Sequence, residues 1–249
     1  MTAGLAPGPS SGRARRALPL GRAEVHVWHR GLAHDDKHEA LAGLLSTDER
    51  LRAARFVFER DAVRYVVGRA TLRQILGAYL AVTPERIAFS YGPQGKPALA
   101  WPGEPLAFNV SHSGDVALYA VSWDRRVGVD VELVRQVDDL KGLAARVFAA
   151  AERAELASLA ADQRVRAFFN GWTRKEAFVK AVGDGLSHPL HTFVVSLDPA
   201  APARLVAVGD SPGATSGWSL HALAAGTGYS AALVAEGEIQ TPTCRTWTA

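Results

Sequence analysis

The order of helical and extended segments constrains the fold of this chain more than any other feature of its sequence. A strand pattern at 24–30 precedes a long helical pattern at 45–80, and short strand patterns follow between 86 and 133. A second helical pattern at 137–183 is again followed by strand patterns, from 192 to 237. The order therefore predicts an α+β protein of two pseudo-symmetric halves, each with helices packed on a small antiparallel sheet.

The boundaries of these halves follow from the same pattern. We expect an N-terminal half over 24–125 and a C-terminal half over 126–238, joined near 124–127. Residues 1–23 are rich in Gly, Pro, Ser and Arg and lack the apolar core of a secretory signal, so they are expected to form a disordered leader. Residues 239–249 are expected to form a loose tail, and the helical pattern at 45–80 is expected to contain two helices that meet near Phe58.

Composition narrows the chemistry only slightly. The single cysteine, Cys244, excludes an internal disulfide and every multi-cysteine zinc site, and it favours a reducing cytoplasm. No apolar run reaches 18 residues, which argues against a membrane span. The net charge of +3 is spread among 28 basic and 25 acidic residues, which is a mild indication of an anionic ligand and a weak one of nucleic acid.

Two carboxylates alternate within the sequence VGVDVEL at 127–133. In a strand, Gly128, Asp130 and Glu132 share one face, and the backbone positions of the two acids lie about 6.6 Å apart. Their charges would repel by on the order of 2 kcal/mol at an effective dielectric constant of about 20, and a divalent cation between them would reverse the sign. Gly128 would leave room for a bulky ligand. The alternative is an amphipathic strand with its polar face in water.

A third carboxylate lies in FFNGWTRKEAFVKAVGDGL at 168–186. Trp172, Glu176 and Lys180 follow one another at four-residue spacing and so form one row on a helix, beside Phe169. A surface ion pair between Glu176 and Lys180 is one interpretation. The other is that a carboxylate beside Trp172 is half-buried and needs a cation. Asp130, Glu132 and Glu176 together would suit Mg²⁺, which prefers oxygen ligands, and Lys175 and Lys180 would be available for phosphates.

Three further segments carry candidate ligand groups. Ser111 and His112 in FNVSHSGDVAL should point to opposite faces of a strand, which disfavours a nucleophile and base pair and leaves either an anion site or a turn that satisfies its own backbone. Lys96 lacks the spacing of a Walker loop but could reach a phosphate as a point charge. Five arginines of the first helical pattern fit a solvated helix face, and they are Arg52, Arg55, Arg60, Arg64 and Arg69. Three of them, Arg52, Arg55 and Arg69, fit a basic rim equally well.

Four ordered blocks, QGKPAL, FNVSHSGDVAL, VGVDVEL and GWTRKEAFVKAVGDGL, resemble the 4′-phosphopantetheinyl transferases of the large, surfactin-synthetase-activating type, within the holo-acyl-carrier-protein synthase superfamily. The last two blocks match the G-x-D-x-E and W-x-x-K-E-A-x-x-K patterns of that family, and the resemblance extends from about residue 24 to residue 236. It implies the two-half fold of that family with coenzyme A in the cleft between the halves. It also implies a Mg²⁺-dependent transfer of phosphopantetheine to a serine of an apo acyl or peptidyl carrier protein, with release of adenosine 3′,5′-bisphosphate.

The resemblance also implies residue roles. Asp130, Glu132 and Glu176 would bind Mg²⁺, with Asp130 also at the coenzyme. The coenzyme phosphates would be contacted by Lys96, Ser111, His112, Lys175 and Lys180, and its adenosine 3′-phosphate by Arg64 and Arg52. Our hypothesis for catalysis is that Glu176 takes the proton of the serine and Lys180 contacts the bridging oxygen.

The resemblance further favours a monomer in the cytoplasm that serves nonribosomal-peptide or polyketide biosynthesis and binds neither nucleic acid nor membrane. The sequence departs from the family at Glu49 and Phe58, where basic or imidazole groups would be expected near the 3′-phosphate. Two alternatives remain open at this level: a binding module for a phosphate ligand or nucleic acid, and a catalytically silent homologue.

Overall fold

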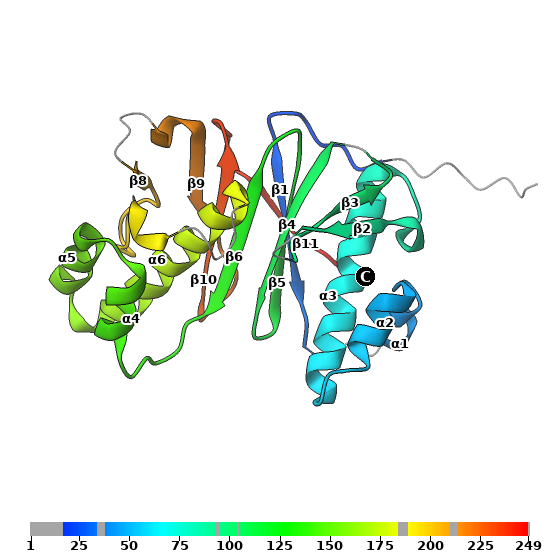
Figure 1. Ribbon diagram of the computed structural model, residues 1–249, viewed down its shortest axis with the longest axis horizontal. Coiled ribbons are helices and arrows are strands. Elements are labelled where there is room, and N and C mark those ends of the chain that lie inside the picture. Colours follow the sequence, from blue (N-terminus) through cyan, green and yellow to red (C-terminus); the bar gives the residue numbers. More distant parts are fainter. Residues whose placement is uncertain are drawn as a thin grey trace, which may run out of the picture.

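The computed structural model describes residues 17–33, 38–92, 95–103, 105–183, 189–209 and 214–248. Its elements confirm the predicted α+β order of two successive halves (Figure 1). The N-terminal half contains β1 (Val25–Gly31), α1 (His38–Ala42), α2 (Thr47–Ala53), α3 (Glu59–Leu80), β2 (Ala88–Tyr91), β3 (Pro97–Trp101), β4 (Leu106–Ser113) and β5 (Val116–Trp123). The C-terminal half contains β6 (Val127–Leu133), α4 (Leu140–Val147), α5 (Ala150–Ser158), α6 (Ala161–Val182), β7 (Phe193–Val195), β8 (Leu205–Val208), β9 (Trp218–Ala222) and β10 (Tyr229–Glu236). A final strand, β11 (Thr243–Thr246), follows.

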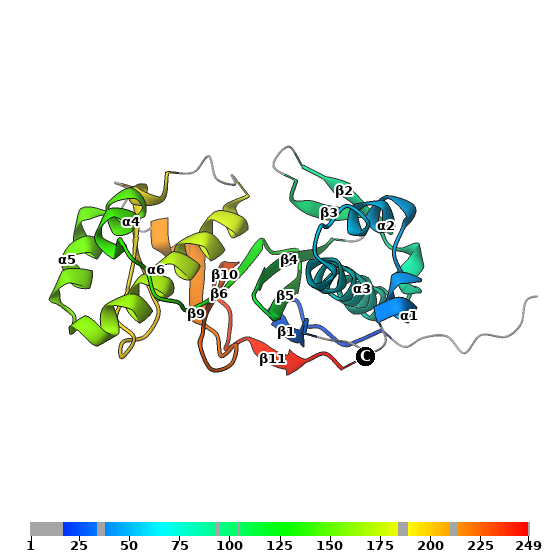
Figure 2. The ribbon, with the colours of Figure 1, turned by 90° about the horizontal axis from the view of Figure 1, so that it is seen from below.

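The two main sheets lie side by side between the long helices. One sheet has the strand order β11-β1-β5-β4 and the other β6-β10-β9, while β2-β3 and β7-β8 form separate hairpins. Figures 1 and 2 show α3 on the outer side of the first sheet and α6 on the outer side of the second. The layers therefore run helix, sheet, sheet, helix.

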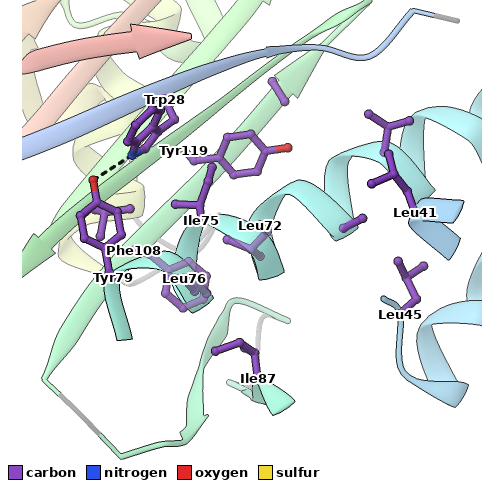
Figure 3. Close-up of a cluster of buried hydrophobic side chains, with 14 of the residues drawn as sticks. Trp28, Leu41, Leu45, Leu72, Ile75, Leu76, Tyr79, Ile87, Phe108 and Tyr119 are labelled. Atoms are coloured by element: carbon purple, nitrogen blue, oxygen red, sulfur yellow. Dashed lines mark hydrogen bonds between the residues drawn. The ribbon is translucent and has the colours of Figure 1, made fainter. Parts of the chain in front are cut away.

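Three hydrophobic clusters correspond to these layers. The first packs α3 against its sheet and includes Trp28, Ile75, Tyr79, Phe108 and Tyr119 (Figure 3). The indole Nε1 of Trp28 donates a hydrogen bond of 2.9 Å to the hydroxyl of Tyr79 within it. The second cluster packs α6 against β7 and β10, and the third joins the two sheets through residues of β1, β5, β6 and β10. The third cluster makes the two halves one packed body.

The departure from the family pattern at Glu49 has a structural explanation. Glu49 is 2% exposed and accepts hydrogen bonds from Arg69 at 2.5 Å and from Arg73 at 2.7 Å. It also closes a capping box with Ser46 at the start of α2. The acidic residue therefore fastens α2 to α3.

The structure corrects the expectation of a loose tail at 239–249. Strand β11 pairs in parallel with β1, from His26 opposite Thr243 to His29 opposite Thr246. The backbone N–H of Trp247 then donates to the carbonyl of His29 at 2.8 Å. The end of the expected leader is also packed, since Leu18 and Leu20 contact the first cluster; residues 1–16 lie outside the described part. In both cases the partners lie far away in the sequence.

Within the described residues, no helix is both long and apolar enough to cross a membrane.

Candidate functional site

A polar cavity lies at the junction of the two halves. Its volume is about 310 Å³, and it is lined by Val110, Ser111, His112, Asp130, Glu132, Trp172, Glu176 and Lys180. These residues come from β4, β6 and α6, so both halves contribute. The row of Trp172, Glu176 and Lys180 predicted from helical spacing does face a single site, and the three predicted carboxylates meet there.

A close approach of α6 to β6 builds this arrangement. A Cβ atom on Gly128 would lie 2.0 Å from the carbonyl oxygen of Ala177 and 2.5 Å from the backbone nitrogen of Ala181. Gly128 therefore makes room for the backbone of α6, and the expectation that it makes room for a bulky ligand is wrong. The short separation brings Lys180 over Asp130.

Lys180 makes three polar contacts at the cavity. Its Nζ lies 2.7 Å from Asp130 Oδ1 and donates to Ser111 Oγ at 3.0 Å and to the carbonyl of Val129 at 3.3 Å. Asp130 is only 4% exposed, and this burial raises its pKa, against the opposing effects of the Lys180 charge and of the hydrogen bonds from Lys180 and Ser111. The lysine thus supplies the charge that Asp130 needs.

Glu176 is less well compensated. Burial raises the pKa of its carboxyl group, and the nearby charges of Asp130 and Glu132 raise it further, while Lys180 lowers it. A carboxyl group with a raised pKa holds a proton more readily than an ordinary glutamate. A raised pKa of this kind is one requirement of a general base.

The carboxylates partly fit the predicted metal. Asp130 Oδ2 and Glu176 Oε1 are both buried and have no hydrogen-bond partner among the described residues, which is the condition that a bound cation would relieve. Hard oxygen donors of this kind suit Mg²⁺. Across the described ranges, however, no group of three or more His, Cys, Asp or Glu side chains is arranged to hold a metal ion as it stands. The three carboxylates share a cavity without forming a finished three-ligand centre.

A second and larger cavity adjoins the first and shares Val110 and His112 with it. Its volume is about 580 Å³, within the range of pockets that hold ligands of coenzyme size. Arg52 and Arg64, the residues expected at the 3′-phosphate, both line it. Arg64 donates to Asp115 at 2.5 Å, whereas Arg52 lies 5.5 Å from the ring centroid of Tyr65 and has no ion pair within the described part of the chain. Arg52 is thus the less neutralised of the two.

Lys96 approaches the site from the N-terminal half. Its Nζ donates to the backbone carbonyl of Lys180 at 2.6 Å, near the end of α6. Its pKa is lowered by burial and by the charge of Lys180. The lysine therefore lies close enough to Lys180 for the two charges to interact, as a shared anionic ligand would require.

Lys175 does not belong to this site, and the expectation that it contacts a phosphate is wrong. It is fully buried, and its Nζ lies 2.8 Å from Glu152 Oε1. The same ammonium group donates to the carbonyls of Leu190 and Phe193. Lys175 lies on a different face of α6 from Glu176, because adjacent helical residues point about 100° apart.

Two residues that contact β6 beside the cavity were not among the predicted site residues. Ser113 Oγ donates to Glu132 Oε2 at 2.8 Å, and Asn109 Oδ1 accepts from the backbone N–H of Val129 at 2.9 Å. The two-residue alternation of Asn109, Ser111 and Ser113 was the signal that could have found them, since it places all three on one face of β4.

Comparisons with known proteins agree on one family. Residues 126–234 match the family described as the 4′-phosphopantetheinyl transferase superfamily, and residues 32–124 match the N-terminal region of 4′-phosphopantetheinyl transferase. The chain is 42% identical over 191 residues to the 4′-phosphopantetheinyl transferase HetI of a Nostoc strain, covering 76% of this chain and 80% of the relative. It is 36% identical to the 4′-phosphopantetheinyl transferase psf-1 of Bacillus pumilus, over 69% of this chain and 74% of the relative.

A third relative is the 4′-phosphopantetheinyl transferase ffp of Bacillus subtilis, at 33% identity over 65% of this chain and 70% of the relative. The two family matches meet at the junction between β5 and β6, so each covers one of the two structural halves. The chain therefore belongs to the 4′-phosphopantetheinyl transferase superfamily and is an enzyme of that class.

Proposed function

We propose that this enzyme takes the 4′-phosphopantetheine group from coenzyme A and attaches it to a serine of an apo carrier protein. The observation that supports this most directly is the pair of adjoining cavities. A cavity with carboxylates and a lysine opens onto a larger one with arginines. A ligand with a pyrophosphate and a nucleotide would place its reactive phosphate in the first and its nucleotide in the second.

In the proposed reaction, the serine oxygen forms a bond to the phosphorus that carries the pantetheine arm. The bond from that phosphorus to the bridging oxygen breaks, and adenosine 3′,5′-bisphosphate leaves with the electron pair. The serine proton goes to Glu176, whose pKa is raised by burial and by the charges of Asp130 and Glu132. Lys180 stabilises the charge that develops on the leaving oxygen.

Other residues would hold the substrate. Lys96 and His112 would contact the coenzyme phosphates, and Arg52 with Arg64 would contact the nucleotide end. Ser111, expected at the phosphates, donates its hydrogen bond to Asp130 instead. Asp130, Glu132 and Glu176 would hold Mg²⁺, which when bound supplies further neutralisation of the pyrophosphate charge. The unpartnered oxygens of Asp130 and Glu176 support this part of the proposal.

We also propose that one chain is the active unit, because β4 of one half and β6 with α6 of the other already enclose the cavity. Carrier proteins of nonribosomal-peptide and polyketide synthesis are the proposed partners. A cytoplasmic setting fits the free and exposed Cys244.

The test is a transfer assay with coenzyme A, Mg²⁺ and a panel of apo carriers, read as the mass gain of one phosphopantetheine group. We expect Glu176→Gln to lower kcat by about 10²-fold or more, since general-base catalysis contributes about 10² to 10⁴. Coenzyme A binding, measured by calorimetry, should change little. Glu85→Gln, on an exposed glutamate, is the control and should match the parent enzyme. No mass gain with any carrier would contradict the proposed function, and near-normal turnover of Glu176→Gln would remove only the base assignment.

A further inference from the structure

Strand β6 has one edge that no backbone of its own sheet covers. It is an outer strand of the sheet β6-β10-β9, and its free edge faces β4, which belongs to the other sheet. The backbone N–H groups of Val129, Val131 and Leu133 point to this edge and are accepted by side chains of β4 at 2.9, 3.4 and 3.1 Å. The acceptors are Asn109, Ser111 and Ser113, in that order along β4.

The match follows from strand geometry. Side chains at alternate positions of β4 and N–H groups at alternate positions of β6 both repeat at about 6.6 Å. The three hydrogen bonds therefore follow one another like the rungs of a ladder, and we call them rungs below. A buried N–H group without an acceptor costs about 1–3 kcal/mol, and the rungs at Val129 and Val131, which are buried, remove that cost. The rung at Leu133 is exposed. Side chains of one half thus take the place of a neighbouring strand for the other half.

Two of the three side chains, those of the serines, also donate a hydrogen bond. Ser111 Oγ donates to Asp130 Oδ1, and Ser113 Oγ donates to Glu132 Oε2, each at 2.8 Å. A serine hydroxyl has a single proton, and a backbone N–H already occupies one of its lone pairs. The proton is therefore directed at the carboxylate, which fixes where each hydroxyl and each carboxylate oxygen point.

We infer that Ser113 is a positioning residue for Glu132, and that, in the ladder formed by Asn109, Ser111 and Ser113, the two serines set the β6 carboxylates against the cavity. The inference rests on the proposed function, because Glu132 belongs to the proposed site. It adds a residue that neither binds substrate nor reacts. The rung at Asn109 differs, since the residue of β6 beside it on the carboxylate face is Gly128 and there is no side chain to orient.

The experiment compares Ser113→Ala with Ser113→Thr, which keeps the hydroxyl, and with Asn109→Ala, which removes a rung without a carboxylate. Loss of a residue that orients a ligand typically costs about 10 to 100-fold, so we expect Ser113→Ala to lower kcat by about tenfold while KM for coenzyme A stays within about twofold. Ser113→Thr should recover most of the loss. Amide hydrogen exchange at Leu133 should accelerate in Ser113→Ala and remain slow in Ser113→Thr.

Several results would overturn the inference. One is a Ser113→Ala enzyme with parental kcat, even if its Leu133 amide exchanges faster. Another is an equal loss in Ser113→Ala and Ser113→Thr, which would assign the effect to packing. A third is an equal loss of kcat in Asn109→Ala, which would assign it to strand register alone.

A parent enzyme without transfer activity would instead contradict the proposed function. The ladder would then be judged from Leu133 exchange together with Mg²⁺ affinity by calorimetry in the same proteins. We expect Mg²⁺ affinity to fall by about tenfold in Ser113→Ala and to stay near the parental value in the other two. Unchanged affinity in all three would overturn the inference.

Discussion

Two lysines of α6, five residues apart, lie in different environments. Lys180 faces the cavity, whereas Lys175 is fully buried beside Glu152, which also accepts the backbone N–H groups of Val195 and Ala149. We predict that Lys175→Met lowers the free energy of unfolding by about 3–5 kcal/mol, because it leaves the Glu152 carboxylate buried without a counterion. Adding Glu152→Gln should restore part of the loss, since it removes that charge and keeps an amide oxygen as acceptor.

Urea unfolding of the single and double variants checks this prediction. Lys141→Met, on an exposed lysine of α4, is the control and should change stability by less than about 0.5 kcal/mol. A double variant no more stable than Lys175→Met would show that the buried charge of Glu152 is not the cause.

Helical spacing explains why one lysine could be placed from the sequence and the other could not. Four-residue spacing identified the row of Trp172, Glu176 and Lys180, and all three line one cavity. The same spacing puts Lys175 on another face, so its assignment to a phosphate rested on its position next to Glu176 and on the family resemblance. Its real partner, Glu152, lies on α5, and no local pattern reports contacts between two helices.

At the scale of elements, the contact between β6 and α6 depends on the absence of one side chain. A methyl group on Gly128 would overlap the carbonyl of Ala177 at 2.0 Å, so Gly128→Ala must move the helix away from the strand. We predict a loss of about 1–3 kcal/mol in stability, the usual cost of overpacking. Turnover should fall by about 10²-fold, because a displaced Lys180 no longer reaches Asp130 and its electrostatic stabilisation is lost.

Thermal unfolding and the transfer assay measure both effects. Gly31→Ala is the matched control, since Gly31 is also in a strand and an added Cβ would meet nothing within 4 Å. Parental turnover in Gly128→Ala would show that the close approach of α6 is unnecessary for activity.

Most elements were predictable because their side chains repeat with a strand or helix period. The break near Phe58 between α2 and α3 was predicted, and Phe58 is the N-cap residue of α3. Helix α1 was missed because its five residues are too few for a period to show. Strand β11 was missed because TCRT has no apolar alternation and pairs with a strand more than 200 residues earlier.

At the scale of the whole molecule, the order of the two halves could be predicted from the sequence, but the contacts between the halves could not. The alternating polar residues of β6 suggested a face toward water or a ligand, and Ser111 with His112 of β4 suggested an anion site or a turn. In the structure they meet one another, Asn109 and the serines of β4 against the backbone and carboxylates of β6. The alternation shows that the polar residues of each strand share a face, but which strand that face meets depends on how the two sheets pack, and neither segment records that packing.

The C-terminal strand also joins the two halves, because the chain leaves β10 of one sheet and adds β11 to the edge of the other (Figure 2). Trp247 completes the contact: its ring meets that of Trp28 edge-on with centroids 5.1 Å apart, and its Nε1 donates to Gln74 Oε1 at 3.2 Å. Removal of residues 243–249 would expose the edge of β1 and the face of Trp28. None of the proposed site residues lies in this segment.

We therefore predict that deletion of 243–249 lowers Tm by about 5–10 °C, for a loss of about 2–3 kcal/mol at roughly 2–4 °C per kcal/mol in a chain of this size. Turnover at 20 °C should stay within about twofold of the parent, because the cavity is built by β4, β6 and α6. Trp247→Ala should produce part of the same shift. Calorimetric melting and the transfer assay separate the two effects, and a deletion that abolishes turnover while Tm is unchanged would show that the strand acts on the site rather than on the stability of the N-terminal sheet.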